Sequence, residues 1–592
     1  MIARHQHGGV TMMKAPRKPE QTSGITAHRP VVSGRRHVIS AGHYLAAHAG
    51  FAILEAGGNA FDAGVAAGIA LGVLQSDLVN VAGVAPIILY HAESGKVFTV
   101  SGLGVWPQLV TPDYFQKRHG GKIPRGLLRT VVPAAPDAWI QTLQRWGSMS
   151  FGEVAAASVR FAKEGFAAHP LLCETITTHR QSYEEWPSNR AIYLPNGRPP
   201  RVGEIFVQSD LANSLQYMID EERAAAGKGR HAALEAARAA FYTGDLARTI
   251  VAYHEANGGL LRMGDLAEFR SGIEPAVAVP FGELTVHCCG PWCQGPVLGQ
   301  MLRLVEATGC HKQPHNSFAY VHGLTEIMKL AFADRHAYYG DPKFLDVPLE
   351  RLLSRGYAEE RAGLVRGDRA WREMPPPGLA RSRMAEAAGP VTASPQPQLD
   401  TSYVCVVDRH GNAFSATPSD VSSSTPVIPG TGLCPSSRGS QSWADPSLPA
   451  SVAPGKRPRL TPSPALALGA DGRAIPFGTP GGDVQAQAML QTFLNRIVFG
   501  MDPQAAVEAP RFATYSFPDS FEPHSMQPGR LVLEARLPQA LADELAAVGH
   551  DVQWWPDWTW KAGAICMIDS DPGARLHRAG ADPRRSTYAL GW

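Results

Sequence analysis

Residues Leu399 to Pro418 read LDTSYVCVVDRHGNAFSATP and predict two short strands joined by a turn. Ser402 to Val407 is apolar or β-branched on both alternating faces, which is typical of a strand covered on both sides. Asp408 to Asn412 supplies turn residues, and Ala413 to Thr417 returns as a second strand that ends before a proline. The stretch therefore predicts a buried β-hairpin with Thr401 at its mouth.

Thr401 has two interpretations. β-Branched residues often begin strands, so Thr401 can be purely structural. Alternatively, the chain cuts itself between Asp400 and Thr401, which makes Thr401 an amino-terminal residue. Its own α-amine, with an ordinary pKa of about 8, would then act as the base that turns its hydroxyl into a nucleophile.

The motifs around Thr401 resemble those of a known enzyme family. Thr401 precedes a short apolar strand, then VVD at 406–408 and GNAFSAT at 411–417. This order resembles the start of the small subunit in the gamma-glutamyltransferase (gamma-glutamyltranspeptidase) family of amino-terminal-nucleophile (Ntn) hydrolases. Further similar motifs are GGNAFDA at 57–63, FYTG at 241–244 and TEIMKLAFADRHAYYGDP at 325–342, so the likeness spans roughly residues 38–592. The resemblance favours the nucleophile interpretation of Thr401.

The resemblance also implies a fold and a division of the chain. It implies an α/β (α+β) architecture, a four-layer αββα sandwich formed jointly by two fragments of one autocleaved chain. We expect a large fragment over 38–400 and a small catalytic fragment over 401–592, which remain obligately associated. We expect a flexible basic tail over 1–37 and a flexible Pro-rich linker over 366–400.

Three residues outside the hairpin are implied in catalysis. Ser419 stands where the family has a hydroxyl residue that hydrogen-bonds the nucleophile. Gly481 and Gly482 lead into a predicted helix and stand where the family has its SPGG motif. Backbone N–H groups at such a turn can stabilise a tetrahedral oxyanion, although an ordinary turn has the same appearance.

The positions that would bind a glutamyl group depart from the family pattern. Leu103 replaces an arginine that binds the α-carboxylate, and Leu460 and Thr461 replace a serine pair with the same role. Arg438 and Gln441 occupy the loop that binds the α-amino group in the family. Because a buried unpaired charge is unfavourable, we expect poor binding of glutathione. Arg438 is expected to face a carboxylate without a neighbouring amine.

These residues predict a function and leave alternatives. The predicted activity is hydrolysis of a small-molecule amide through a Thr401 acyl-enzyme, with water or an amine as acceptor and no metal or organic cofactor. One alternative is a true gamma-glutamyltransferase or glutathione hydrolase with an altered pocket. Another is an uncleaved, inactive binding protein of the same fold. A cysteine hydrolase using Cys405 is disfavoured, because the sequence assigns that thiol no base.

Composition excludes several classes of function. A chain of 592 residues is longer than one hydrophobic core usually accommodates, so more than one lobe is expected. Its 55 basic and 53 acidic residues nearly cancel, so the net charge gives no sign of binding to nucleic acid or to an anionic membrane. No stretch has the length of a membrane span or of a signal peptide, so we expect a cytoplasmic protein. The eight cysteines are scattered, as buried thiols are, and Cys288, Cys289 and Cys293 lack a second ligand pair for zinc.

Periodicity predicts several elements of the large fragment. His43 to Gly58 and the segment from Asn59 predict two helices, and Ile87 to Tyr90 with Val97 to Val100 predict a strand pair. Thr325 to Pro342 predicts an amphipathic helix that turns its apolar residues inward and its charged residues outward.

Overall fold

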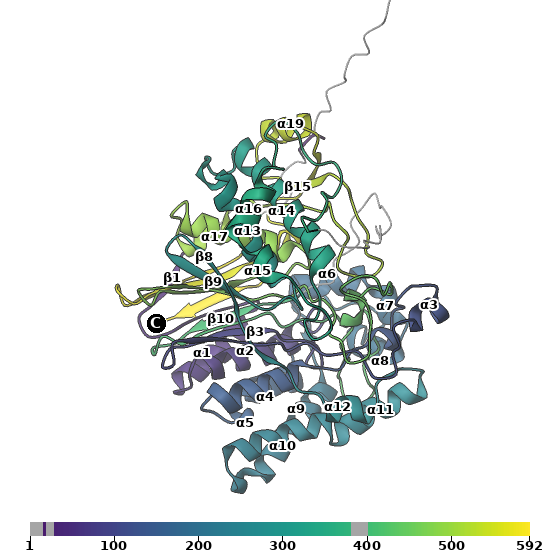
Figure 1. Cartoon of the computed structure of the whole chain (residues 1–592). Coiled ribbons are helices and arrows are strands. Elements are labelled where there is room, and N and C mark those ends of the chain that lie inside the picture. Colours follow the sequence, from purple (N-terminus) through teal and green to yellow (C-terminus); the bar gives the residue numbers. More distant parts are fainter. Residues whose placement is uncertain (1–15, 19–28, 380–400) are drawn as a thin grey trace, which may run out of the picture.

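The computed structural model describes residues 16–18, 29–379 and 401–592. Within these ranges, a pair of seven-stranded sheets is stacked face to face between two helical layers (Figure 1). Neighbouring strands are antiparallel throughout both sheets. The expected four-layer αββα sandwich is confirmed.

Each large sheet is built from both ends of the chain. In spatial order the first sheet consists of β19 (Tyr588–Gly591), β2 (Val38–Ala41), β10 (Val404–Val407), β11 (Ala413–Ala416), β3 (Ile87–His91), β4 (Lys96–Val100) and β7 (Ile273–Pro275). The second consists of β1 (Val32–Gly34), β18 (Leu576–Ala581), β17 (Cys566–Asp571), β13 (Ala474–Gly478), β12 (Ala465–Gly469), β9 (Leu284–Cys288) and β8 (Val277–Phe281). Strands from before and after residue 400 therefore lie within the same hydrogen-bonded ladders.

The predicted hairpin lies at the centre of the first sheet. Every residue of β10 and β11 is buried, and the pair is flanked by β2 and β3. Asp408 fixes the turn, because its Oδ1 accepts hydrogen bonds from the backbone of His410 and Asn412 at 2.8 and 3.1 Å. Its Oδ2 accepts from Ala60 N at 2.8 Å and so ties the turn to the start of helix α2 (Ala60–Leu74).

Helices cover the outer faces of both sheets. α1 (Tyr44–Glu55) and α2 pack on the first sheet, and α13 (Gly295–Thr308), α14 (Phe318–Tyr338) and α17 (Val484–Ile497) cover the second (Figure 1). Close approach of α2 to β11 requires Gly64, because a Cβ there would lie 2.2 Å from the Phe414 ring. A third apolar cluster, which includes Tyr403 and Ile568, fills the space between the sheets. The core thus has three layers of side chains.

The remaining elements surround this sandwich. The helices are α3 (Tyr114–His119), α4 (Ala135–Trp146), α5 (Phe151–Glu164), α6 (Pro170–Thr178), α7 (Arg180–Glu184), α8 (Pro187–Tyr193), α9 (Ser209–Ala224), α10 (Arg230–Tyr242), α11 (Asp245–Ala256), α12 (Met263–Ala267), α15 (Leu349–Leu352), α16 (Arg355–Ala362), α18 (Pro503–Glu508) and α19 (Gln539–Ala547). β5 (Phe166–Ala167) pairs with β6 (Ile205–Phe206), and β14 (Phe512–Thr514), β15 (Arg530–Glu534) and β16 (Asp551–Trp555) form a small third sheet.

The burial of helix α14 differs from the prediction of an amphipathic helix with exposed charges. The apolar residues expected to face inward are buried, but the charged residues are buried too. Lys329 Nζ donates to Glu326 Oε1 at 2.7 Å, and Arg335 pairs with Asp483 at the start of α17. The prediction of outward charges is wrong because α14 is enclosed on all sides, and its charges are paired within the core.

The described segments of the predicted tail and linker are held in place. β1 pairs with β18, with Val32 opposite Ala579. In the linker, the Trp371 carbonyl accepts from Lys329 Nζ at 2.6 Å, and Gly378 N donates to Asp334 Oδ1 at 2.9 Å. Residues 380–400, and with them the predicted cleavage position at Asp400, lie outside the described residues.

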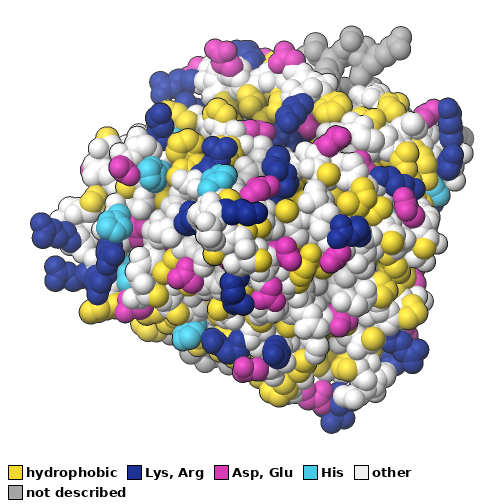
Figure 2. Space-filling model, turned by 90° about the horizontal axis from the view of Figure 1, so that it is seen from below, with side chains coloured by type: hydrophobic (Ala, Val, Ile, Leu, Met, Phe, Trp, Pro, Cys, Tyr) yellow, Lys and Arg dark blue, Asp and Glu magenta, His cyan; other side chains and the backbone are white. Residues whose placement is uncertain are grey.

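The distribution of surface charges and the burial of the cysteines agree with what the composition predicts. On the face shown in Figure 2, basic and acidic side chains are interspersed among apolar and uncharged ones. All eight cysteines are buried thiols, as predicted. Within residues 16–18, 29–379 and 401–592, no helix combines the length and apolarity needed to cross a membrane.

Buried histidines predict loss of stability in acid. Burial lowers the pKa of His169 and His524 to about 4 and that of His254 and His336 to about 3. The unfolded chain therefore binds protons that the folded chain does not. This stabilisation is complete above the unfolded pKa of 6.5 and is lost as pH falls towards the folded values, by about 1.4 kcal/mol per pH unit and histidine.

We expect the Tm measured by calorimetry to fall steeply between about pH 6.5 and 4.5. A His524→Gln variant should show a shallower decline, whereas His231→Gln, at an exposed position, should match the parent. A Tm that stays constant across this range would contradict the prediction.

Candidate active site

Thr401 and Ser419 lie side by side where the two ends of the central hairpin meet. Their hydroxyl oxygens are 2.8 Å apart, and both residues are buried, with Thr401 1% exposed. The backbone aligns them, because Ser402 N donates to Pro418 O at 3.0 Å and Ser419 N donates to Val84 O at 2.9 Å. The candidate nucleophile is thus in hydrogen-bond contact with the hydroxyl expected to assist it.

A buried cation is connected to this hydroxyl pair. Arg438 begins a 3-10 turn (Arg438–Gln441), and its Nη2 donates to Ser419 Oγ. Its Nε lies 3.7 Å from Asp420 Oδ2, while Asp420 accepts from the hydroxyls of Ser436 and Ser437 at 2.6 Å each. Hydrogen bonds therefore connect Arg438 to Ser419 and Ser419 to Thr401. Only the Ser419 hydroxyl separates the guanidinium of Arg438 from the candidate nucleophile.

Asp420 adopts an unusual backbone conformation. Its φ of 137° lies in a region that residues other than glycine rarely adopt. Two contacts hold it there, because Asp420 N donates to Leu78 O at 3.1 Å and Asn80 Nδ2 donates to Asp420 O at 2.7 Å. Such strain persists only where surrounding structure imposes it, and it is common at functional sites.

The predicted glycine pair forms a fixed turn before α17. Gly481 and Gly482 have φ values of 126° and 55°, which explains the requirement for glycine. The turn is held from outside, since Gln294 Nε2 donates to Gly482 O at 2.9 Å. The first turn of α17 carries Gln485, whose Nε2 reaches Thr401 Oγ1 at 3.5 Å. The glycine turn and Thr401 are therefore neighbours in space.

The five predicted substrate contacts fall into three groups. Arg438 reaches Ser419, as described. Gln441 and Thr461 bond each other, with Gln441 Nε2 donating to Thr461 Oγ1 at 2.8 Å. Leu103 and Leu460 pack in one buried apolar cluster, which is completed by Val84, Cys289, Trp292 and Cys293. Two positions that would have held polar carboxylate-binding residues thus form part of an apolar wall.

Several site residues were missed from the sequence. Asp420 directly follows Ser419, and Gln485 comes three residues after the glycine pair, so a polar residue close to a motif was the available signal. Arg585 gives no such signal. It lies 184 residues after Thr401, and its Nη1 donates to Thr401 O at 3.3 Å.

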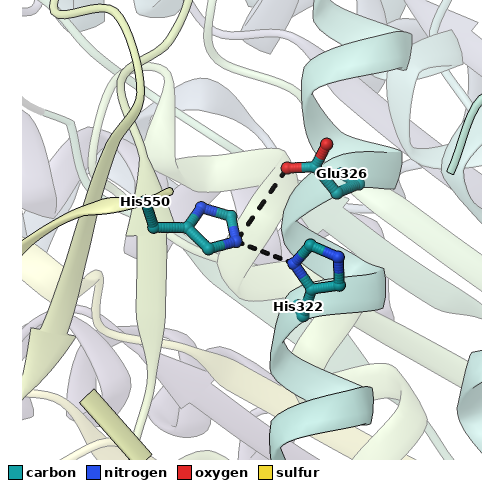
Figure 3. A group of neighbouring side chains, drawn as sticks. All are labelled: His322, Glu326 and His550. Atoms are coloured by element: carbon teal, nitrogen blue, oxygen red, sulfur yellow. Dashed lines mark hydrogen bonds and ion pairs between the residues drawn. The ribbon is translucent and has the colours of Figure 1, made fainter. Parts of the chain in front are cut away.

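One group of described side chains has the composition of a metal site. His322 and Glu326 lie one turn apart on α14 and face His550, which precedes β16 (Figure 3). His322 Nδ1 and His550 Nε2 hydrogen-bond each other at 2.8 Å, and His322 Nε2 donates to Arg366 O at 2.6 Å. Because the Lys329 ammonium occupies Glu326 Oε1 and the imidazoles bond each other, the group is arranged as a hydrogen-bond network rather than as a metal site.

Comparison with known proteins identifies the family. Residues 46–592 match the gamma-glutamyltranspeptidase family. The chain belongs to this family. This confirms the resemblance drawn from the hairpin and its flanking motifs.

Relatives of this gamma-glutamyltranspeptidase family member carry acylase and hydrolase names. The acylase ACY 1 proenzyme of Pseudomonas sp. (strain SE83) is 31% identical over 598 residues, covering 96% of this chain and 99% of that protein. The glutathione hydrolase-like YwrD proenzyme of Bacillus subtilis (strain 168) is 30% identical over 564 residues, covering 95% and 99%.

A solved structure gives the same result for the fold. Cephalosporin acylase from Bacillus halodurans superposes with a TM-score of 0.83 at 28% identity, covering 98% of this chain and 99% of that one. The chain is thus an enzyme of the Ntn-hydrolase class that contains the gamma-glutamyltranspeptidases and acylases.

Proposed function

We propose that this chain is an amidohydrolase that cuts itself between Asp400 and Thr401 and then uses Thr401 as an amino-terminal nucleophile. The observation that carries the proposal is the contact between Thr401 Oγ1 and Ser419 Oγ at 2.8 Å, beside the buried Arg438. Both relatives named above are proenzymes, which supports processing of this chain.

The proposed reaction is acyl transfer in two steps. The α-amine of Thr401 takes the Oγ proton as Oγ bonds to the amide carbonyl carbon, and the N–H groups of the Gly481–Gly482 turn stabilise the oxyanion. The C–N bond then breaks, and the leaving nitrogen receives that proton. Water repeats the sequence on the ester and releases a carboxylic acid. In self-cleavage the same hydroxyl bonds to the Asp400 carbonyl carbon, and the Asp400–Thr401 C–N bond breaks. The Thr401 nitrogen receives the hydroxyl proton and becomes the free α-amine, and water then hydrolyses the ester that joins the two fragments.

The charges around Thr401 support an acyl group that ends in a carboxylate and has no amine beside it. Arg438 is the cation connected to Ser419, whereas Leu103 and Leu460 offer an apolar surface where a glutamyl group would need polar contacts. A desolvated ammonium next to this cation and apolar wall would be unfavourable. The acylase names of the relatives fit this substrate class.

A matched pair of anilides tests the substrate class. Glutaryl-4-nitroanilide and γ-glutamyl-4-nitroanilide differ only by the α-ammonium group. We expect kcat/KM to be at least about tenfold higher for the glutaryl compound, which corresponds to about 1.4 kcal/mol for excluding the ammonium. Faster hydrolysis of the γ-glutamyl compound would overturn the assignment.

That opposite result would support a glutathione hydrolase with an altered pocket. The specific observation in its favour is the Gln441–Thr461 pair, whose amide and hydroxyl oxygens could accept hydrogen bonds from an ammonium. The glutathione hydrolase-like relative at 30% identity points the same way. The two anilides therefore separate the two candidates in one assay.

A further inference from the structure

Arg585 reaches the candidate nucleophile from the opposite end of the small fragment. The residue follows β18 and is 7% exposed. Its Nη1 donates to Thr401 O at 3.3 Å, and its Nη2 donates to Trp560 O at 3.3 Å. The guanidinium also lies over the Trp560 ring, 5.3 Å from the ring centroid.

The support for Arg585 extends into the large fragment. Trp560 Nε1 donates to Glu174 Oε1 of α6 at 3.0 Å. The guanidinium is therefore held between the indole and two carbonyl oxygens that belong to separate segments. A planar group held in this way has a defined position, so its charge lies at a fixed place relative to Thr401.

We propose that Arg585 is a positioning residue for the Thr401 α-amine: it holds the Thr401 carbonyl and, after cleavage, its positive charge favours the neutral amine that accepts the Oγ proton. The inference rests on the proposed function, because it requires Thr401 to be amino-terminal. Arg585 does not touch substrate in this role and acts through the main chain of Thr401.

The distance makes the effect substantial. The nitrogen and carbonyl oxygen of one residue are about 3 Å apart, so Arg585 Nη1 lies within roughly 6 Å of the future amine. At an effective dielectric of about 40, between the value for a near-surface pair and that of water, a unit charge at that distance lowers the pKa of an amine by about one unit. An amine with an ordinary pKa of about 8 would then be about half neutral at pH 7, compared with roughly one tenth without the shift.

Two ion pairs also belong to segments of the site. Arg438 lies 3.7 Å from Asp420, and Asp483, behind the glycine turn, pairs with Arg335. Arg585 differs from these residues because its guanidinium contacts the main chain of Thr401 itself. The amine is therefore expected to respond most strongly to Arg585.

The pH dependence of kcat/KM tests the inference in the processed enzyme. The parent, Arg585→Gln, Arg585→Lys and Arg575→Gln are compared on the preferred anilide, after mass spectrometry has shown that the small fragment begins at Thr401. Arg585→Gln should move the acid limb up by about one pH unit. Arg585→Lys should move it by less, and Arg575→Gln, at an exposed position ten residues earlier, should leave it unchanged.

Two results would overturn the inference. One is an unshifted acid limb in Arg585→Gln, with kcat/KM lowered equally at every pH, which is the signature of a purely structural role. The second measurement needs no variant, because cyanate carbamylates neutral amines. The Thr401 amine of the parent should react with a midpoint about one pH unit below that of a peptide with the same amino-terminal sequence, and equal midpoints would contradict the inference. A small fragment that does not begin at Thr401 would instead refute the proposed function.

Discussion

Thr401→Ala is expected to leave the chain in one piece and to abolish hydrolysis of both anilides. The variant lacks the hydroxyl that attacks the Asp400 carbonyl, and it also lacks the nucleophile for the substrate. Loss of a catalytic nucleophile reduces kcat by about 10⁶-fold in well-studied hydrolases, so the remaining rate should be background. A denaturing gel and intact mass measured over several days report scission, and the anilide assay reports turnover.

Ser402→Ala provides the matched control for this variant. Ser402 is the neighbouring buried hydroxyl, so its removal should preserve scission and most of the turnover. Scission or full activity in Thr401→Ala would refute the role of Thr401. A single persistent band from the parent protein would instead support an uncleaved binding protein of the same fold.

Arg438→Gln is expected to lower kcat/KM for the glutaryl anilide selectively. A hydrogen bond to a charged group contributes about 2–3 kcal/mol, so we expect a loss of about 30- to 150-fold. Butyryl-4-nitroanilide has the same chain as the glutaryl compound without its terminal carboxylate, so its kcat/KM should fall much less. The glutaryl-to-butyryl ratio of kcat/KM is therefore the measurement.

The ratio also separates two roles of Arg438. Its Nη2 bonds Ser419, so the variant must first be shown to process completely. Equal losses on both anilides would contradict recognition of the carboxylate. Such a result would mean that Arg438 acts only on the hydroxyl pair beside it.

The centre of the fold was predictable from local sequence. The hairpin was readable because β10 and β11 are apolar on both faces and the turn between them contains Asp408 and Gly411. The start of α2 was readable from Asn59 and Asp62, which form a capping box. The order of strands was not readable, because β2 pairs with β10 and β19 across hundreds of residues of chain.

The buried charges of α14 illustrate a second limit. Periodicity treats a charged residue as exposed, whereas Lys329 and Arg335 are 0% exposed and paired. Their partners include Asp483, which lies far along the chain. A helical pattern contains no information about such partners. Sequence periodicity therefore predicts that the charged face of an enclosed helix is exposed to solvent, even when its charges are buried and paired.

Some residues of the candidate site were predictable from the sequence, and others were not. Thr401, Ser419 and Arg438 lie in or beside motifs of one family, and the structure brings them into one chain of contacts. Gln485 and Arg585 reach Thr401 from 84 and 184 residues away, which only the tertiary fold determines. The apolar character of Leu103 and Leu460 was evident, but their packing in a shared cluster was not.

The mixing of strands from both sides of residue 400 has a consequence for recovery after denaturation. An uncut chain can refold by itself at any dilution. Two severed polypeptides must first find each other, so their reassembly becomes a second-order process that slows as the solution is diluted. The lifetime of the mature enzyme in dilute solution would therefore be set by the rate at which its two polypeptides unfold and dissociate, because separated polypeptides would reassociate only slowly.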